Sequence, residues 1–230
     1  MSQIVCMTHL QAVADGVWTA RVPQRFYGLE LGARLTALRT APGQILVFSP
    51  IRLDDALATE LEALGEVRDI VLPNKYHHLY AAPYLERFPE ARLFGAEGLA
   101  KKRPDLKLAE LGDGRAPDWP GCRTLLVRGM PAMNEVVLLH EPSATLLVAD
   151  LAFNLRQREV PRLTRWYLKF SKLDGFGQTG LIRAVTKDRA ALKASLDSLL
   201  ALPFDRVIVC HGDVLESGGV QAMEQAFSWL

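Results

Sequence analysis

The sequence predicts an α/β fold in which two β-sheets pack face to face, with helices on their outer faces. Three observations indicate this. Apolar strand patterns open the chain, and helices and strands then alternate. A second run of strands follows, and it again ends in alternating helix and strand. No linker divides the 230 residues, so we expect one domain over residues 1–230.

In the first half, short apolar runs separated by turn residues indicate strands, and leucines at helical spacing (positions 53, 57, 61 and 64) indicate a helix. The Pro42-Gly43 pair is a turn signal between two of the strands. We predict strands at residues 16–22, 26–40, 44–50, 67–73 and 91–95, and helices at 53–64 and 80–89.

In the second half, residues 96–121 are polar and rich in Gly and Pro, which predicts a surface loop. Residues 155–172 form a strongly basic segment. We predict the remaining strands at residues 122–129, 135–141, 144–150 and 206–213, and the remaining helices at 187–202 and 216–230.

Composition excludes several classes of function. Apolar residues make up 49% and charged residues 23%, and the net charge is +1, so neither a nucleic acid nor a membrane is an expected partner. The chain has no basic, apolar leader and no apolar run of about 20 residues. Its three cysteines are far apart in the sequence. We therefore expect a cytoplasmic protein.

Polar residues directly follow three of the predicted buried strands. They are the adjacent pair His77-His78, then Asp150, then His211. A sheet can direct side chains at its strand ends toward a common point, and the loops there carry chemistry.

These motifs resemble those of the metallo-β-lactamase-fold superfamily, over roughly Gly16–Leu230. That superfamily has a His-x-His-x-Asp-His loop after a strand. Aligned on the stretch PNKYHH, the loop places Pro73 and Lys75 at its first two histidines. His77 then stands at the aspartate position and His78 at the last histidine. The resemblance implies a four-layer αββα sandwich of the metallo-β-lactamase type.

The resemblance continues through the second half, and it indicates a degenerate member of the superfamily. Pro131 stands at the third histidine, Asp150 at the bridging carboxylate and His211 at the last ligand, while residues 48–50 (FSP) replace an Asp-x-Gly turn. The positions that serve only the first metal are lost, namely Pro73, Lys75 and Pro131. The Asn-Lys-x-His-His loop also resembles that of uncharacterised bacterial and plant domains, which implies a fold and no activity.

Every position of the second metal site keeps a residue that can bind a metal: His77, His78, Asp150 and His211. The resemblance therefore implies one divalent ion, zinc in preference to iron or manganese, although a site without metal stays open. Four protein ligands would fill all four positions of a tetrahedral zinc ion and leave none for water. In a catalytic site, one of these four residues must therefore not bind the ion. Since it departs from the superfamily pattern, His77 is the expected bystander.

The first functional hypothesis is a metal-dependent hydrolase acting on a small anionic ester, thioester or phosphoester. Asp150 would act with the ion, and Lys75 would stabilise the developing anion, unless it is an ordinary surface lysine. Arg156, Arg158 and Arg162 would attract the substrate, unless they form a solvated helical face. The alternatives are an inactive binding module or an iron-binding redox protein, and a homodimer is left open.

The remaining histidines and cysteines have no partner motif. His9 and His140 are expected to be ordinary surface or strand residues, and Cys6 and Cys122 to be incidental. Cys210 precedes His211 in an apolar strand, where neighbouring side chains point to opposite faces. We therefore predict a core thiol at Cys210 rather than a nucleophile.

Overall fold

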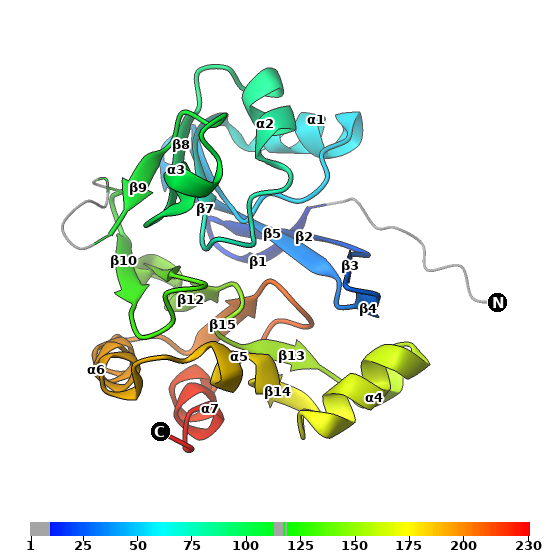
Figure 1. The fold of residues 1–230 in the computed structure, drawn as a ribbon. Helices are drawn as coiled ribbons and strands as arrows, with labels where there is room; N and C mark the ends of the chain where they lie inside the picture. Colours follow the sequence, from blue (N-terminus) through cyan, green and yellow to red (C-terminus); the bar gives the residue numbers. More distant parts are fainter. Residues whose placement is uncertain (1–9, 113–116, 118) are drawn as a thin grey trace.

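The structure is a computed structural model, which describes residues 10–112, 117 and 119–230. It confirms the predicted mixed α/β architecture. Figure 1 shows two sheets between helices, with α1 and α2 on one side and α6 and α7 on the other. The larger sheet contains, in spatial order, β1 (Gln11–Ala14), β2 (Val17–Val22), β5 (Ala33–Ala41), β6 (Gln44–Phe48), β7 (Glu66–Leu72), β8 (Arg92–Ala96) and β9 (Ala109–Leu111).

The smaller sheet and two separate pairs of strands contain the other strands. The smaller sheet is ordered β10 (Cys122–Val127), β11 (Glu135–His140), β12 (Thr145–Val148) and β15 (Arg206–Val209). A hairpin pairs β3 (Arg25–Phe26) with β4 (Leu29–Glu30), and a second two-stranded sheet pairs β13 (Phe153–Leu155) with β14 (Gly175–Gly177). Because β12 and β15 are parallel, their carboxyl ends lie at the same edge of the sheet.

The helices lie mainly between or after the strands. They are α1 (Asp55–Leu64), α2 (Ala81–Arg87), α3 (Leu99–Lys102), α4 (Arg162–Phe170), α5 (Gly180–Val185), α6 (Arg189–Leu200) and α7 (Gly219–Ala226), with short 3₁₀ turns η1 (Glu141–Ser143) and η2 (Gln157–Glu159). The two longest, α1 and α6, each begin at an aspartate. The side chains of Asp54 and Asp188 accept hydrogen bonds from backbone N–H groups of the first turn.

Three apolar layers hold this sandwich together. Phe48 of the larger sheet and Leu147 of the smaller sheet belong to the inner layer, between the sheets. Leu61 of α1 belongs to the layer outside the larger sheet, and Leu192 of α6 to the layer outside the smaller one. Both faces of each sheet are therefore buried, which explains why the strands read as continuous apolar runs rather than alternating patterns.

Two sequence predictions about the elements were wrong in detail. The strand predicted at 26–40 is divided, because Phe26, Tyr27, Gly28 and Leu29 turn back as the β3–β4 hairpin before β5 begins. The predicted loop at 96–121 contains α3 and β9, and β9 pairs in parallel with β8. The first difference comes from the Phe26–Leu29 turn, which the apolar pattern of residues 26–40 does not reveal, and the second from the pairing of β9 with β8, which the polar composition of residues 96–121 does not reveal.

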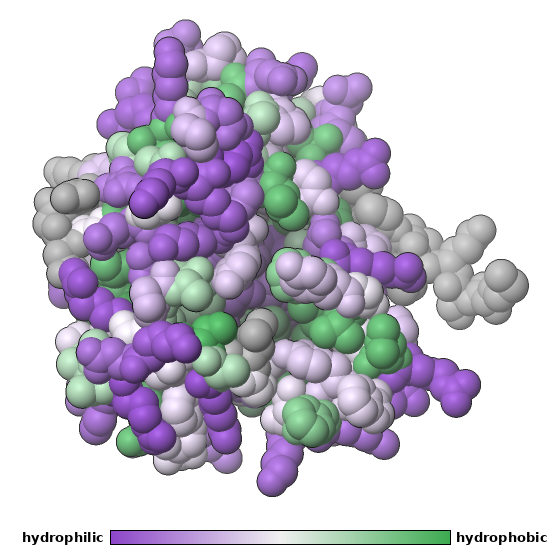
Figure 2. All heavy atoms as spheres, viewed as in Figure 1, coloured by the Kyte–Doolittle hydropathy of each residue, from purple (hydrophilic) through white to green (hydrophobic). Residues whose placement is uncertain are grey.

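The surface around α4 carries both hydrophobic and hydrophilic residues. In Figure 2 green and purple residues lie side by side at the lower right, where Figure 1 draws α4. Among the described residues, no helix has the length and apolar character needed to cross a bilayer.

The inner layer yields a stability prediction. Leu147 is 0% exposed between the sheets, so Leu147→Ala should lower the free energy of unfolding by about 2–5 kcal/mol through lost burial and the cavity left behind. Urea denaturation measures this. Leu163, which is 56% exposed on α4, is the matched control, and Leu163→Ala should change stability by no more than about 0.5 kcal/mol. Equal effects for the two variants would contradict the layered arrangement.

Candidate metal centre

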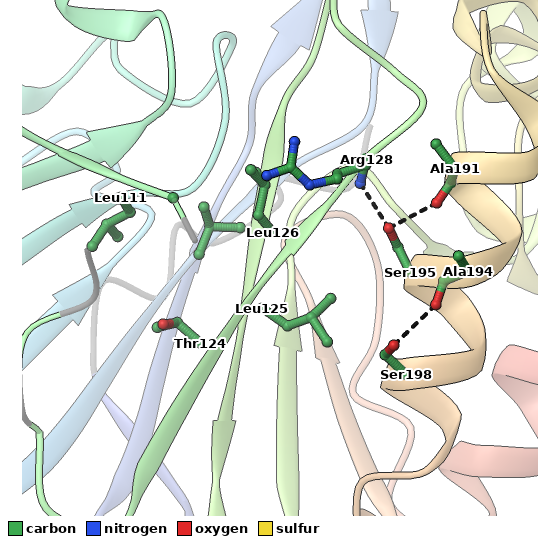
Figure 3. Close-up of a pocket in the computed structure, with 11 residues that line it drawn as sticks. Leu111, Thr124, Leu125, Leu126, Arg128, Ala191, Ala194, Ser195 and Ser198 are labelled. Carbon is green, nitrogen blue, oxygen red and sulfur yellow. Dashed lines mark hydrogen bonds between the residues drawn. The ribbon is translucent and has the colours of Figure 1, made fainter. Parts of the chain in front are cut away.

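The structure has a pocket whose lining cannot bind a metal. It occupies about 500 Å³ between β10 and α6 (Figure 3). Leucine, alanine and hydroxyl side chains line it, together with the guanidinium of Arg128. Ser195 and Ser198 hydrogen bond to backbone carbonyls of their own helix. The lining includes no carboxylate and no imidazole, so the candidate chemistry must be sought elsewhere.

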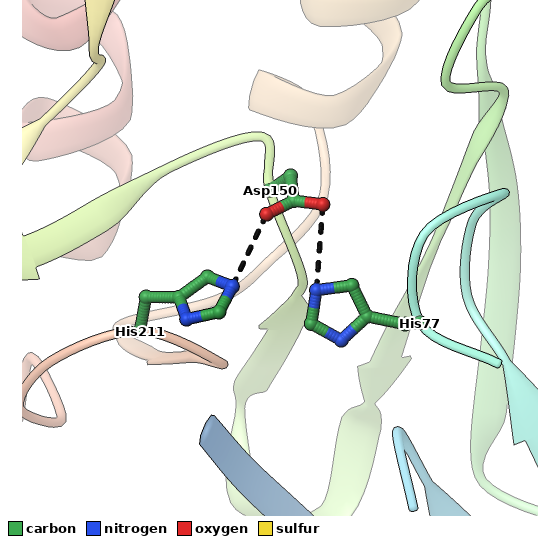
Figure 4. A group of neighbouring side chains, drawn as sticks. All are labelled: His77, Asp150 and His211. Atoms are coloured by element: carbon green, nitrogen blue, oxygen red, sulfur yellow. Dashed lines mark ion pairs between the residues drawn. The ribbon is translucent and has the colours of Figure 1, made fainter. Parts of the chain in front are cut away.

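The polar residues that follow the buried strands do meet at one point. His77 lies in the loop after β7, whereas Asp150 and His211 are each the second residue after the end of a strand, β12 and β15 respectively. In Figure 4 both imidazole rings face the Asp150 carboxylate from opposite sides. The strand ends of both sheets thus supply the three members of the group.

The geometry of the group suits a bound cation. Nε2 of His77 lies 3.3 Å from Oδ2 of Asp150, and Nε2 of His211 lies 3.2 Å from Oδ1. One ligand atom from each residue lies within 4.8 Å of the others. The three side chains are 11%, 15% and 9% exposed, so the group is largely shielded but still reached by solvent.

Each imidazole is oriented through its other ring nitrogen. Nδ1 of His211 lies 2.7 Å from the Gly32 carbonyl oxygen, which can only accept, so Nδ1 carries the hydrogen. In the neutral ring, Nε2 then presents its lone pair toward Asp150. Nδ1 of His77 lies 2.9 Å from the Ser49 hydroxyl, and Phe153 stacks on the His211 ring. Such outer partners fix the rings of metal-binding histidines.

Asn74 ties the histidine loop to Asp150. Its Oδ1 accepts hydrogen bonds from the backbone N–H groups of Tyr76 (2.8 Å) and His77 (3.0 Å). Its Nδ2 donates to Oδ2 of Asp150 (2.9 Å) and to Oε2 of Glu135 (3.0 Å). The side chain is fully buried, and these four bonds use all four of its hydrogen-bonding positions. Asn74 therefore sets where the loop turns and where the carboxylate lies.

Glu135 holds the segment that carries Asp150. Its carboxylate is fully buried and accepts hydrogen bonds from the backbone N–H groups of Ala149, Asp150 and Leu151, at 2.8, 2.8 and 3.1 Å. Burial raises the pKa of Glu135 to about 7, and the neighbouring charge of Asp150 acts in the same direction. The backbone after β12 is thus fixed by one acidic side chain from β11.

Asp150 and His77 stabilise each other's charged forms. Burial acts to lower the pKa of His77, but the Asp150 carboxylate and the Cys210 side chain outweigh it and raise this pKa well above its usual value. Burial likewise acts to raise the pKa of Asp150, but His77 and His211 outweigh it and lower this pKa. The carboxylate is therefore ionised and faces two imidazoles, an arrangement that a cation can share.

The expected assignment of the two adjacent histidines was the reverse of what the structure shows. His77 joins Asp150 and His211, whereas Nδ1 of His78 lies 3.0 Å from Nη1 of Arg103. Burial and the cations Lys102 and Arg103 lower the pKa of His78. The physical reason is the turn at Asn74, which directs His77 to the strand ends and leaves the next side chain facing α3.

The positions predicted to have lost the first metal lie together. The Lys75 ammonium donates to the Pro131 carbonyl oxygen at 2.9 Å. The backbone N–H of Lys75 donates to the carbonyl oxygen of Met133. The Pro73 carbonyl accepts from the backbone N–H of Val136 at 2.8 Å. These bonds tie the loop after β7 to the turn before β11.

The three arginines predicted to bind substrate lie on exposed positions at η2 and α4. Arg158 pairs with Glu159, and among the described residues no hydrogen bond or ion pair joins Arg156, Arg158 or Arg162 to the group. Their role in substrate binding stays a prediction.

Cys210 is buried in the layer between the sheets, as expected for a core thiol, and its side chain also interacts with His77. Cys122 is a free, half-buried thiol, and His140 is a buried strand residue beside Ser143. The expectations for Cys6 and His9 lie outside the described residues.

Sequence reasoning missed the residues that position the group. Ser49, Asn74 and Glu135 were not singled out, because none of them stands at a ligand position of the superfamily pattern. Two signals pointed to them. Asn74 lies two and three residues before backbone N–H groups that an asparagine side chain can capture, and Glu135 opens an otherwise apolar strand.

The architecture and the position of the group at the strand ends define a metallo-β-lactamase fold. A metallo-β-lactamase from Pontibacter korlensis matches with a TM-score of 0.64 and 11% identity, over 96% of this chain and 98% of that one. FIM-1 from Pseudomonas aeruginosa, a metallo-β-lactamase in its mono-zinc form, matches with a TM-score of 0.63 and 11% identity, over 96% of this chain and 95% of that one. A metallo-β-lactamase from Hirschia baltica matches with a TM-score of 0.64 and 10% identity, over 95% of this chain and 96% of that one.

At such low identity these matches establish the fold and not the activity. No protein-family model and no curated protein matches the sequence itself. The chain therefore has the metallo-β-lactamase fold, with a His/Asp/His group near its strand ends.

The role of Asn74 can be tested by substitution. Asn74→Ala removes four hydrogen bonds and leaves buried groups unpaired, so the free energy of unfolding should fall by about 3 kcal/mol. Zinc affinity should fall roughly 10–100-fold, because the His77 loop is no longer held against Asp150. Urea denaturation and titration calorimetry measure the two effects.

Asn154→Ala is the matched control for this variant. Its side chain donates one exposed hydrogen bond, to the Asp213 carbonyl oxygen at 3.0 Å. We expect it to cost about 1 kcal/mol or less and to leave zinc affinity unchanged. Zinc affinity that survived Asn74→Ala would show that the loop holds His77 without Asn74.

Proposed function

We propose that the protein is a metal-dependent hydrolase that uses one divalent ion, zinc in preference to iron or manganese. His77, Asp150 and His211 would hold the ion. The convergence of two Nε2 atoms on one ionised carboxylate carries this proposal, because the three residues come from three separate strand ends. The mono-zinc form of FIM-1 shows that a protein of this fold can hold a single zinc ion.

The donor set fits a catalytic ion better than the four-ligand site expected from the sequence. Three protein ligands leave the fourth position of a tetrahedral ion open, as in catalytic zinc sites. His78, the fourth candidate, is engaged with Arg103 instead. An ion held here would polarise a substrate oxygen and lower the pKa of bound water.

The side chains around the ion would bind and orient the substrate. Asp150 faces both imidazoles, and its ionised carboxylate, partly reached by solvent, could orient the attacking water by accepting a hydrogen bond from it. Lys75 uses one of its three N–H donors on the Pro131 carbonyl, so two remain for a substrate oxygen. Phe153 covers one face of His211 and limits water on that side.

Charge indicates the class of substrate. Two neutral imidazoles, one carboxylate and a divalent ion leave a net charge of +1, and the Lys75 ammonium adds to it. We therefore propose a small anionic ester, thioester or phosphoester. A cationic substrate would be repelled by the same charges.

The ligand assignment predicts one ion per chain. Asp150→Ala, His77→Gln and His211→Gln should each lower zinc affinity by more than the roughly 10–100-fold that loss of an outer partner costs. His78→Gln, in the same loop, and His140→Gln, buried elsewhere, are matched controls and should keep one ion. Elemental analysis after dialysis measures the stoichiometry. Two tightly bound ions per chain, or loss of the ion in His78→Gln, would contradict the assignment.

The hydrolase proposal predicts turnover that depends on Asp150. Zinc-loaded protein, screened against small anionic esters, thioesters and phosphoesters, should hydrolyse at least one class faster than Asp150→Asn does. Lys75→Met should keep the ion and lower kcat/KM roughly 10–100-fold, through loss of a donor to the developing anion. If no substrate were turned over above the Asp150→Asn rate by metal-loaded protein, the group would be a binding site without catalysis.

A further inference from the structure

One side of the molecule exposes several large apolar side chains. We call Phe26, Tyr27, Leu163, Trp166 and Phe170 the aromatic tip. They are 38%, 90%, 56%, 68% and 80% exposed. Soluble proteins usually bury most of such side chains, and a contiguous exposed group marks an interaction site. The metal group and its supporting residues use none of these five.

The aromatic tip depends on α4, which has one buried face and a second, exposed apolar face. Thr164 and Leu168, four residues apart, are buried against the body of the protein. Leu163, Trp166 and Phe170 follow the i, i+3, i+7 spacing of a second face, which points to solvent. The helix therefore buries one narrow face and leaves a second apolar face uncovered.

The β3–β4 hairpin extends this apolar face. Tyr27 and Phe26 are in edge contact with ring centroids 4.6 Å apart, and Gly28 lies beside Leu163. The backbone N–H of Glu30 donates to the Thr164 hydroxyl at 2.8 Å, which fastens the hairpin to α4. Two segments distant in the sequence thus form one surface.

Basic side chains surround the aromatic tip. Although the whole chain carries a net charge of only +1, residues 156–172 contain six basic residues and one acidic residue. All six basic side chains are exposed, namely Arg156, Arg158, Arg162, Arg165, Lys169 and Lys172. In Figure 2 hydrophilic residues adjoin hydrophobic ones over this part of the molecule.

We propose that the aromatic tip and its basic surround bind the surface of an anionic lipid membrane. A helix with Trp, Phe and Leu on one face and Lys or Arg beside them lies in the plane of the lipid interface. The apolar side chains enter the headgroup region, while long basic side chains reach the anionic headgroups. The protein would lie on the membrane, because no described helix could span it.

The arrangement of charge favours a lipid surface over two other occupants. A second copy of the chain would meet this surface across a two-fold axis, which sets the basic residues of one copy against those of the other. Single-stranded nucleic acid needs aromatic rings open for stacking. Trp166 and Phe170 instead stack on each other, with centroids 6.1 Å apart and planes 17° from parallel.

Membrane binding would bring the metal group close to the lipid. Phe26 of the aromatic tip lies in edge contact with Tyr76, with centroids 6.3 Å apart, and Tyr76 directly precedes His77. The loop that carries His77 therefore adjoins the proposed membrane surface. This inference does not depend on the proposed hydrolysis, because binding to lipid is measured without turnover.

Vesicle co-sedimentation tests the proposal. The full-length protein should bind vesicles containing about 30% phosphatidylserine more than tenfold better than phosphatidylcholine vesicles, and salt should weaken this binding. Trp166→Ser/Phe170→Ser and Arg162→Glu/Lys169→Glu should each lower binding more than about tenfold. Lys101→Glu/Lys107→Glu, two exposed lysines near α3, is the charge-matched control and should bind as wild type does. Circular dichroism confirms that each variant is folded.

Trp166→Phe separates insertion of the aromatic tip from simple charge attraction. This variant keeps an apolar ring and should still bind, but it should lose the blue shift of tryptophan emission that vesicles cause in the wild type. The proposal is overturned by absence of binding to anionic vesicles, or by equal binding to neutral ones. A preference for single-stranded nucleic acid, or a dimer that Trp166→Ser/Phe170→Ser breaks, would assign the surface to another occupant and overturn it as well.

Discussion

The geometry of the His77, Asp150 and His211 group depends on one buried carboxylate, which pairs with no cation among the described residues. Glu135 is stabilised by four N–H donors, three from the backbone that follows β12 and one from Asn74. Without such donors a buried charge would cost many kcal/mol. Because the donors come from loops of both sheets, this one side chain fixes the two ligand-bearing loops relative to each other. Ser49 and Gly32 then only orient the rings.

The sequence predicted the sandwich and the general position of the group, because both follow from hydrophobic pattern. Buried strands read as apolar runs, and polar residues directly after them lie at strand ends. For this reason Asp150 and His211 were placed together in advance. The same pattern could not distinguish His77 from His78. That choice is made in a loop, where the amide oxygen of Asn74 captures two backbone N–H groups and sets the direction of each side chain.

Other features depend on contacts that lie far apart in the sequence. Glu135 is a charged residue at the start of a strand, where exposure is the usual expectation, yet tertiary donors allow it to be fully buried. The β3–β4 hairpin is fastened through Thr164, more than a hundred residues away. In the sequence, α4 resembles an ordinary solvated basic helix. Its exposed aromatic rings could not be predicted, because periodicity alone does not show which apolar face the rest of the fold covers.

The bond between Lys75 and the Pro131 carbonyl has an evolutionary consequence. In the resemblance to two-metal proteins of this fold, Pro73, Lys75 and Pro131 each stand where a histidine belongs. No single substitution can therefore supply all three histidines. Replacing Lys75 would also remove the ammonium hydrogen bond to the Pro131 carbonyl, whereas the backbone carbonyl contacts of Pro73 and Pro131 do not depend on their side chains. A second ion at these positions would therefore require several substitutions made together.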